Sequence, residues 1–415
     1  MTSSALLSRK NAVIVFIAFA SAYFLSALVR AITATLSPTL TTEFQLQSSD
    51  LGLLAGGYFF GFALTQLPLG NWLDRHGPKK VLLGFLSLSV LGCILFSIAT
   101  DFSALLLARV ITGIGVSACL MAPLTGYRRW FDAGTQIRAN SWMLMSGSVG
   151  MLASTLPVQW LMPIWGWRPI FIGLGLLIVL SMLLITWTAP AWKQTQTATK
   201  PGGLFSGYGE VWRHPYFKRL MPMGFFCYAG LVAMQTLWAG PWMVRVSGYS
   251  ADEGAWGLFV INVVMMFTFW AWGFINPWLA TKGWDANKIM TWGVPLSLMV
   301  SVWIAQNGQN AGLISWVLFC VTSSFVSISQ PALGMAFPAT LVGRALSAYN
   351  LVIFSGIFVV QWGFGLLVDL LKQIGWSNEQ AYQGAMGTFA FFCISSYLYF
   401  LHNKVDNPSI PTAET

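Results

Sequence analysis

The feature that most limits how this chain can fold is a succession of apolar stretches, each long enough to cross a membrane, from residue 12 to residue 401. A hydrocarbon core of about 30 Å is crossed by about 20 helical residues. Only 8% of the 415 residues are charged, whereas an average soluble domain carries about 25%. We therefore expect an all-α polytopic membrane protein whose surface faces mainly lipid.

Turn residues and charges divide the apolar sequence into twelve predicted transmembrane helices. They cover residues 12–38, 50–73, 79–99, 102–126, 140–162, 168–188, 218–243, 254–279, 287–306, 311–338, 346–371 and 380–401. If the chain starts in the cytoplasm, 17 of its 22 Lys and Arg residues lie on the cytoplasmic side. Arg30 and Arg109 lie within spans, and Arg168, Arg245 and Lys372 lie outside. This asymmetry obeys the positive-inside rule. It predicts a multi-pass protein of the plasma membrane, the inner membrane in bacteria, with both termini cytoplasmic.

A polar stretch over residues 189–217 divides the chain into two six-helix halves. We predict an N-terminal half at 1–188, a cytoplasmic interdomain linker at 189–217, a C-terminal half at 218–403 and a cytoplasmic tail at 404–415. Similar residues recur in both halves at nearly one constant offset: Gly52 and Gly257, Gly77 and Gly283, Arg138-Ala139 and Arg344-Ala345. Duplicated halves are typical of transporters that bind substrate between repeats. Chance coincidence in an apolar sequence is the alternative.

The loop after the second span carries the most specific motif of the sequence. It reads Gly70-Asn-Trp-Leu-Asp74-Arg75-His-Gly77-Pro-Lys79-Lys80 and resembles the G-x-x-x-D-R-x-G-x-[RK]-[RK] signature of the major facilitator superfamily. Arg109-Val-Ile-Thr-Gly113-Ile-Gly115 in the fourth span is similar to the R-x-x-x-G-x-G pattern of that family. The resemblance implies the twelve-helix fold of this family and secondary transport by alternating access.

The predicted gating and coupling residues of the loop motif are Gly70, Asp74, Arg75 and Gly77. Gly113 of the fourth span is predicted to belong to the same group. Gly70 lets a neighbouring helix approach, and Gly77 permits a tight turn. The resemblance implies that Asp74 faces the amino end of the eleventh span and holds the cytoplasmic side closed, since a carboxylate is attracted to that end of a helix. The basic residues of the loop are explained equally well as positive-inside anchors.

Two arginines, Arg30 and Arg109, lie inside predicted spans, where a charge costs about 3 kcal/mol or more. The helical rise of about 1.5 Å per residue places both in the outer half of the membrane at similar depth. Under these span boundaries no Asp, Glu, Lys or His lies in a membrane interior. A transported anion is therefore the expected counter-ion, and a carboxylate is favoured because arginine binds it with two parallel hydrogen bonds. As alternatives, Arg30 bonds helix carbonyls or extends outward, and Arg109 couples conformations.

The rest of the predicted substrate site consists of neutral side chains. One face of the first span carries Tyr23 and Arg30 at helical spacing. The other half contributes Tyr228, Gln235, Trp238, Asn350 and Gln361. We expect these groups to hydrogen-bond to the substrate or stack on it. The alternative is that they only hold helices together.

The leading functional prediction is uptake of a small organic anion, with proton coupling left open. The fifth span contains Gly147-Ser-Val-Gly150 and lacks the Gly-Pro element usual in the drug/proton antiporters of the family, which favours uptake over export. The alternatives are a drug or metabolite efflux antiporter and a non-transporting membrane receptor. The sequence shows no nucleophile and base pair, metal cluster or phosphate loop, so we expect neither an enzyme nor a cofactor. The dispersed basic residues argue against nucleic acid as a partner, and we expect a monomer in the lipid bilayer.

Overall fold

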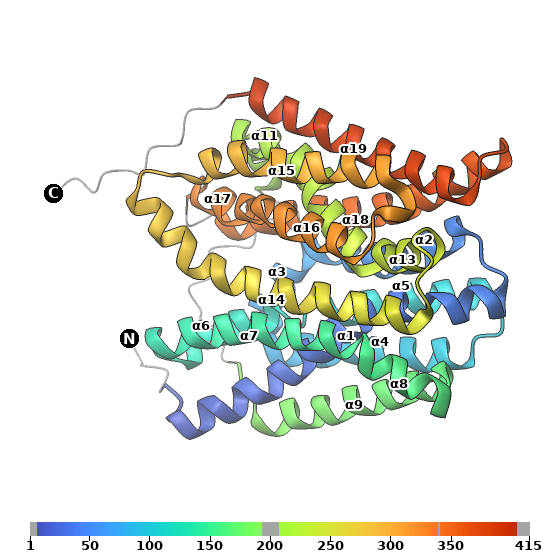
Figure 1. The fold of residues 1–415 in the computed structure, drawn as a ribbon. Helices are drawn as coiled ribbons and strands as arrows, with labels where there is room; N and C mark the ends of the chain where they lie inside the picture. Colours follow the sequence, from blue (N-terminus) through green and yellow to red (C-terminus); the bar gives the residue numbers. More distant parts are fainter. Residues whose placement is uncertain (1–5, 193–206, 339–340, 405–415) are drawn as a thin grey trace.

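The computed structural model describes residues 6–192, 207–338 and 341–404, and this part of the chain consists of helices and short connections without strands. Figure 1 shows the long helices side by side, with the first half of the chain in blue to green and the second in yellow to red. Helix α1 (Arg9–Phe44) begins, and α19 (Asn378–His402) ends, at the same end of the bundle, on the left of Figure 1. We call this the terminal end and the opposite one the far end.

The first half forms six spans, of which three are divided into two helices. After α1 come α2 (Ser48–Leu64) with α3 (Gln66–His76), α4 (Pro78–Ile98), α5 (Phe102–Val116) with α6 (Met121–Trp130), α7 (Ala133–Ala153) with α8 (Leu156–Trp165), and α9 (Trp167–Thr188). A short helix, α10 (Tyr208–Arg213), lies in the predicted linker. The rest of that linker, over 193–206, and the tail from 405 lie outside the described residues, so the domain boundaries stay a prediction.

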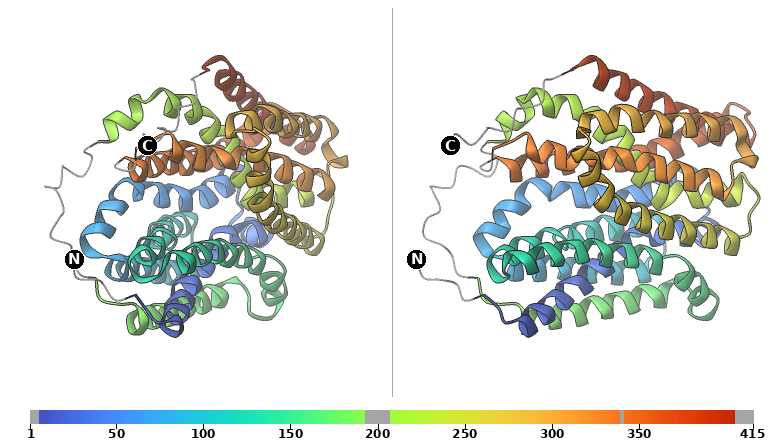
Figure 2. Two further views of the ribbon diagram at one scale, coloured as in Figure 1. Left: turned by 90° about the vertical axis from the view of Figure 1, so that its left-hand side faces the viewer. Right: turned by 60° about the vertical axis from the view of Figure 1, so that its left-hand side comes forward.

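The second half also forms six spans, and Figure 2 shows the two groups of helices from two other sides. The first of these spans combines α11 (Pro215–Met223), η1 (Gly224–Tyr228), α12 (Ala229–Ala233), η2 (Met234–Trp238) and α13 (Ala239–Arg245). The others are α14 (Ala251–Thr281), α15 (Ala286–Asn307) with η3 (Gly308–Asn310), α16 (Leu313–Ser323) with η4 (Ser324–Ile328) and α17 (Ser329–Met335), α18 (Val342–Gln373), and α19.

The predicted fold of twelve transmembrane helices in two six-helix halves is confirmed, and prolines explain two of the breaks. Among the described residues, ten spans are long and apolar enough to cross a membrane as continuous stretches, and α2 with α3 forms one more span that bends by 47°. The broken span of α7 and α8 is the twelfth. Pro68 follows the break between α2 and α3, and Pro157 follows the break between α7 and α8. A proline ring clashes with the carbonyl four residues earlier. That carbonyl belongs to Leu64 and Ala153 respectively, which are the last residues of α2 and α7.

The seventh span contains the dipeptide Gly240-Pro241, which commonly marks the end of a helix. The helix continues through this point to Arg245, but it widens into π-helical turns at η1 and η2. A π turn absorbs an extra residue within a helix. The wide turn of η2 lies just before Pro241, whose ring would conflict with a regular helical carbonyl at Leu237.

Candidate functional site

Arg109 of α5 is fully buried and is held by the helices around it. Its Nη1 donates a hydrogen bond of 2.9 Å to the carbonyl oxygen of Val29 in α1. Its guanidinium carbon lies 5.0 Å from the centre of the Tyr58 ring of α2, in a cation–π arrangement. Nε and Nη2 have no hydrogen-bond partner among the described residues. Arg109 therefore joins three helices and keeps part of its hydrogen-bonding capacity unused.

Arg30 lies next to this group, because the carbonyl that Arg109 binds belongs to the preceding residue. The side chain of Arg30 is half-buried, and its Nε is buried without a partner in the described part of the chain. It is close enough to interact electrostatically with Tyr58 of the first half and with Tyr228 of the second. Within the described residues neither Arg30 nor Arg109 pairs with a carboxylate. Two cations thus lie in neighbouring turns of α1 and α5, without a carboxylate partner among the described residues.

Two tyrosines, Tyr58 and Tyr228, lie near Arg30, and Tyr58 is absent from the predicted site. Tyr23 and Tyr228, which were predicted, are half-buried and interact across the two halves. Tyr58 is fully buried, and its hydroxyl donates to the Ser26 carbonyl at 3.3 Å. The sequence signal for Tyr58 was slight, because a tyrosine within an apolar run looks like any packed ring. The fold alone shows that it lies against Arg109 and beside Arg30.

The other predicted contacts of the second half bond to residues of the same half. Gln235 donates to Asn262 at 2.9 Å, and Asn350 accepts from Gln330 at 2.7 Å. Trp238 is fully buried, donates to the carbonyl of Gln361 at 3.1 Å and packs on Phe364 with ring centres 4.6 Å apart. The Gln361 amide donates to Thr236 at 3.1 Å. These contacts match the alternative in which polar side chains hold helices together, and only Tyr228 of this group lies beside Arg30.

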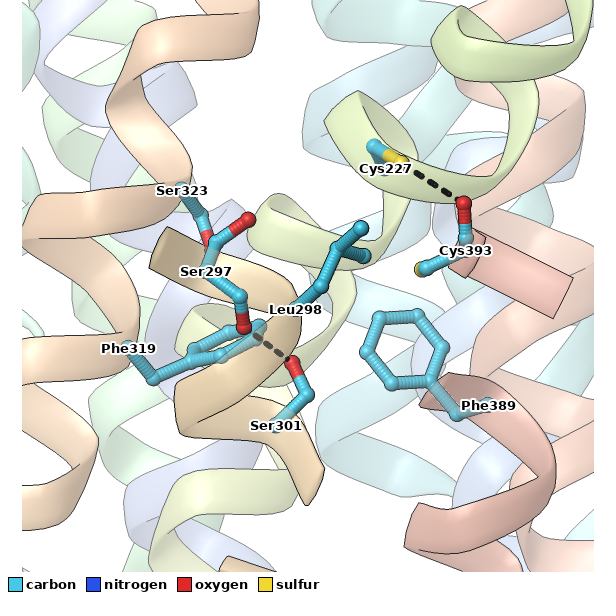
Figure 3. Close-up of a pocket in the computed structure, with 8 residues that line it drawn as sticks. All are labelled: Cys227, Ser297, Leu298, Ser301, Phe319, Ser323, Phe389 and Cys393. Atoms are coloured by element: carbon cyan, nitrogen blue, oxygen red, sulfur yellow. Dashed lines mark hydrogen bonds between the residues drawn. The ribbon is translucent and has the colours of Figure 1, made fainter. Parts of the chain in front are cut away.

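A small cavity in the second half is lined by residues of the four elements η1, α15, α16 and α19: Cys227, Ser297, Leu298, Ser301, Phe319, Ser323, Phe389 and Cys393 (Figure 3). Its volume is about 10 Å³, which is about the space of one water molecule. The close-up shows the hydroxyl of Ser301 bonded to the Ser297 carbonyl and the thiol of Cys227 bonded to the Cys393 carbonyl. This cavity is too small for an organic substrate.

The loop motif adopts the expected tight turn. Gly77 has a φ of +81°, and an added Cβ there would lie 2.3 Å from the Trp192 ring. Lys79 donates to the carbonyls of Thr186 and Ala189 at the end of α9, at 2.6 and 3.2 Å. The loop is therefore fixed to the first half. The side chains of Asp74 and Arg75 are exposed, and Asp74 interacts electrostatically with Arg129 and Arg128 of α6.

Gly70 and Gly113 differ in what surrounds them. An added Cβ at Gly113 would lie 1.9 Å from the Tyr58 carbonyl oxygen, so this glycine lets α5 pack directly on α2. An added Cβ at Gly70 would meet no atom within 4 Å. The expected approach of a helix to Gly70 is therefore not made in this conformation.

At the far end, polar contacts join the two halves. Asp369 of α18 accepts hydrogen bonds from the backbone N–H groups of Ser48 and Ser49, at 3.1 and 2.6 Å. Arg245 donates to the Thr41 hydroxyl at 2.9 Å. In a third contact, between α8 and α14, Gln159 donates to Asp252 at 2.9 Å. The structure therefore represents a conformation in which the far end is closed.

The sequence profile of the Major Facilitator Superfamily matches residues 19–361. The 4-hydroxybenzoate transporter PcaK of Acinetobacter baylyi is 22% identical over 389 residues, which cover 81% of this chain and 82% of the relative. A probable sugar efflux transporter of Helicobacter pylori is 22% identical over 369 residues, which cover 85% and 87%.

Among solved structures, a bacterial homologue of the human lysosomal transporter Spinster, in an inward-facing and unoccupied conformation, matches with a TM-score of 0.77 at 17% identity. The match covers 96% of this chain and 98% of that one. It shows the same fold. Because the family profile covers most of the chain, including the loop motif and Arg109, this multi-pass membrane protein belongs to the Major Facilitator Superfamily of transporters.

Proposed function

We propose that this chain takes up a small organic anion, a carboxylate, by alternating access, with Arg30 as the residue that binds the anionic group. The proposal rests on the missing partners of the Arg30 side chain among the described residues. Its buried Nε has no hydrogen-bond partner and no described carboxylate pairs with it. A buried cation without a partner is costly, and a substrate carboxylate removes that cost by forming two parallel hydrogen bonds with the guanidinium.

Arg109 has a different part in this proposal. Its side chain is fully buried, and its one hydrogen bond goes to the turn of α1 that carries Arg30. We assign it a positioning role, in which it holds α1 and Tyr58 and adds a positive charge behind the site. The opposite assignment, Arg109 as a second direct ligand, requires a movement that exposes its guanidinium.

The substrate class we propose is an aromatic carboxylate. Arg30 lies near the phenol rings of Tyr58 and Tyr228, and the half-buried Tyr228 in turn lies near Tyr23. Aromatic pairs in offset or edge-to-face arrangements contribute about 0.5–1.5 kcal/mol beyond the burial of their area. The name of the relative PcaK, a 4-hydroxybenzoate transporter, agrees with this class.

Three small compounds of similar size test the substrate class on the purified protein. Benzoate has both a carboxylate and an aromatic ring. Cyclohexanecarboxylate keeps the carboxylate but has a saturated ring, and benzamide keeps the aromatic ring but has a neutral amide in place of the carboxylate. We expect the tightest binding for benzoate, weaker binding for cyclohexanecarboxylate and the weakest for benzamide, by thermal shift and calorimetry. Equal binding of benzamide and benzoate would contradict an anion site.

Uptake of labelled benzoate into vesicles tests transport itself. We expect accumulation inside vesicles of native orientation that carry this protein, compared with vesicles without it. Binding of benzoate without movement across the membrane would support the receptor alternative, and outward movement only would support the efflux alternative.

Gating in this proposal uses the loop motif of the first half. By the predicted topology the terminal end is cytoplasmic, so a closed far end corresponds to a site open to the cytoplasm. Asp74, with Gly70, Arg75 and Gly77, then closes the terminal end in the opposite conformation. The exposed Asp74 side chain and the open space at Gly70 support this role.

A further inference from the structure

The spacing G-x-x-x-D occurs near the ends of two helical spans that pack against each other. Gly70 and Asp74 stand near the end of α3, and Gly365 and Asp369 stand near the end of α18. Residues four apart lie on the same face of a helix, so each glycine precedes its aspartate by about one helical turn on that face. Only the first of these motifs belongs to the loop signature described above.

The span of α2 and α3 runs antiparallel to α18. Gly52 lies against the Gln361 backbone, Gly56 lies against Phe358, and the rings of Phe62 and Phe354 have centres 4.2 Å apart. Residue numbers increase towards the terminal end along α2 and α3, and they increase towards the far end along α18. The two G-x-x-x-D motifs therefore lie at opposite ends of one helix pair.

The motif at the far end is engaged with the other half. An added Cβ at Gly365 would lie 2.2 Å from the Ser48 carbonyl oxygen, so the two backbones are in direct contact. One turn later, the two carboxylate oxygens of Asp369 accept from the N–H groups of Ser48 and Ser49. These are the first residues of α2, where N–H groups have no partner within the helix. A carboxylate there is also favoured by the helix dipole.

The motif at the terminal end is disengaged. An added Cβ at Gly70 would meet no atom within 4 Å, and the Asp74 side chain is exposed. The charges that influence Asp74 are Arg129 and Arg128 of its own half. Gly365 and Asp369 thus contact α2 at the far end. At the terminal end the space beside Gly70 is open and the side chain of Asp74 is exposed.

We propose that Asp369 and Gly365 form a second latch, which works in alternation with the one at Asp74 and Gly70. In the conformation described here, Asp369 caps the amino end of α2 and keeps the far end closed. When the halves rock about the contact of Gly56 with Phe358, the far end opens, and Asp74 comes to the amino end of α18. This inference rests on the proposed transport function, because a latch of this kind sets the balance between two access states.

Spin-label distances on the full chain in lipid nanodiscs, without substrate, test this alternation. One label pair, at Thr42 and Ala251, reports on the far end, and a second pair, at Lys80 and Thr281, reports on the terminal end. All four residues are exposed and lie outside both G-x-x-x-D motifs. The variants are Asp369→Asn, Asp74→Asn and the two combined. The control is Asp50→Asn, because Asp50 lies at the same end of α2 but accepts its hydrogen bond from Gln47 of its own half.

We expect Asp369→Asn to lengthen the far-end distance and shorten the terminal-end distance, with a change of about tenfold in the ratio of the two states, as expected for loss of a charged hydrogen bond. Asp74→Asn should shift the ratio in the opposite direction, and the combined variant should return towards the wild type. Asp50→Asn should leave both distributions unchanged. An Asp369→Asn protein with wild-type distances, or with the same distances as Asp50→Asn, would overturn the proposal.

A glycine pair on α18 gives the same test without removing a charge. Gly365→Ala should open the far end because its Cβ collides with the Ser48 carbonyl. Gly363→Ala, two residues earlier, meets no atom within 4 Å and should not. Equal distances in these two variants would also overturn the latch, including when Asp369→Asn does not fold. Because no substrate is present, a negative result here is separate from a failure to bind benzoate.

Discussion

Arg109 of α5 donates a hydrogen bond from Nη1 to the carbonyl oxygen of Val29 in α1, over 2.9 Å. The next residue of α1 is Arg30, so the fully buried arginine of one helix is fixed to the turn that carries the half-buried arginine of another. The Tyr58 ring lies against the Arg109 guanidinium. The two cations therefore have different surroundings. Arg30 lies near Tyr228 of the second half, and Arg109 holds the turn of α1 that carries Arg30.

The first prediction concerns Arg109. Arg109→Lys should lower the uptake rate about tenfold or more while the dissociation constant for benzoate changes only a few-fold. A lysine keeps the charge, but it is a flexible point charge without the planar group of arginine. It therefore cannot bond the Val29 carbonyl and lie flat on Tyr58 together. Binding and uptake measured on the same preparation separate the two effects. A loss confined to affinity would show that Arg109 is a direct ligand.

The second prediction concerns the packing of α5 on α2. Gly113→Ala should lower the melting temperature of the purified protein, because the added Cβ would lie 1.9 Å from the Tyr58 carbonyl oxygen. Forcing an extra methyl group into a packed interior typically costs about 1–3 kcal/mol. The control is Gly173→Ala in α9, where no atom lies within 4 Å of the added group. If both variants melt at the wild-type temperature, this helix contact is not as close as described.

The third prediction concerns orientation in the membrane. Thr199→Cys, in the predicted linker and outside the described residues, should react with an impermeant maleimide only from the cytoplasmic side. Asn307→Cys, at the far end of α15, should react only from the outside. The five native cysteines are buried, so the wild-type protein supplies the background. Reaction of both from the same side would contradict the predicted topology.

Much of the fold is readable from the sequence, because lipid imposes one simple requirement. Each apolar stretch must be a helix that satisfies its own backbone, and each predicted span corresponds to a helix or a broken helix in the structure. The internal shape of the spans is harder to predict. Pro68 and Pro157 divide their spans, whereas Pro241 follows a π-helical turn and leaves its span continuous. Packing against neighbouring helices decides between these outcomes.

The candidate site is readable only where a residue type is unusual for its surroundings. Arg30 and Arg109 stand out because charges within spans are costly. Tyr58 does not stand out, because its importance comes from its position between α1 and α5. Trp238 and Gln361 looked like substrate contacts because their polar groups lacked visible partners in the sequence. In the structure the Trp238 indole donates to the main-chain carbonyl of Gln361, and the Gln361 side-chain amide donates to Thr236.

The central claim is that Arg30 binds the anionic group of the substrate, and calorimetric titration of Arg30 variants with benzoate tests it most directly. Arg30→Ala should weaken binding roughly tenfold to a hundredfold or more, since a hydrogen bond to a charged group contributes about 1.5–3 kcal/mol. Arg30→Lys should retain only part of the affinity, because it loses the planar pair of donors. The control is Arg219→Lys, a buried arginine that bonds the Phe400 carbonyl away from the site and should leave affinity unchanged. An Arg30→Ala protein that is folded in the membrane and binds benzoate with near wild-type affinity would contradict the account.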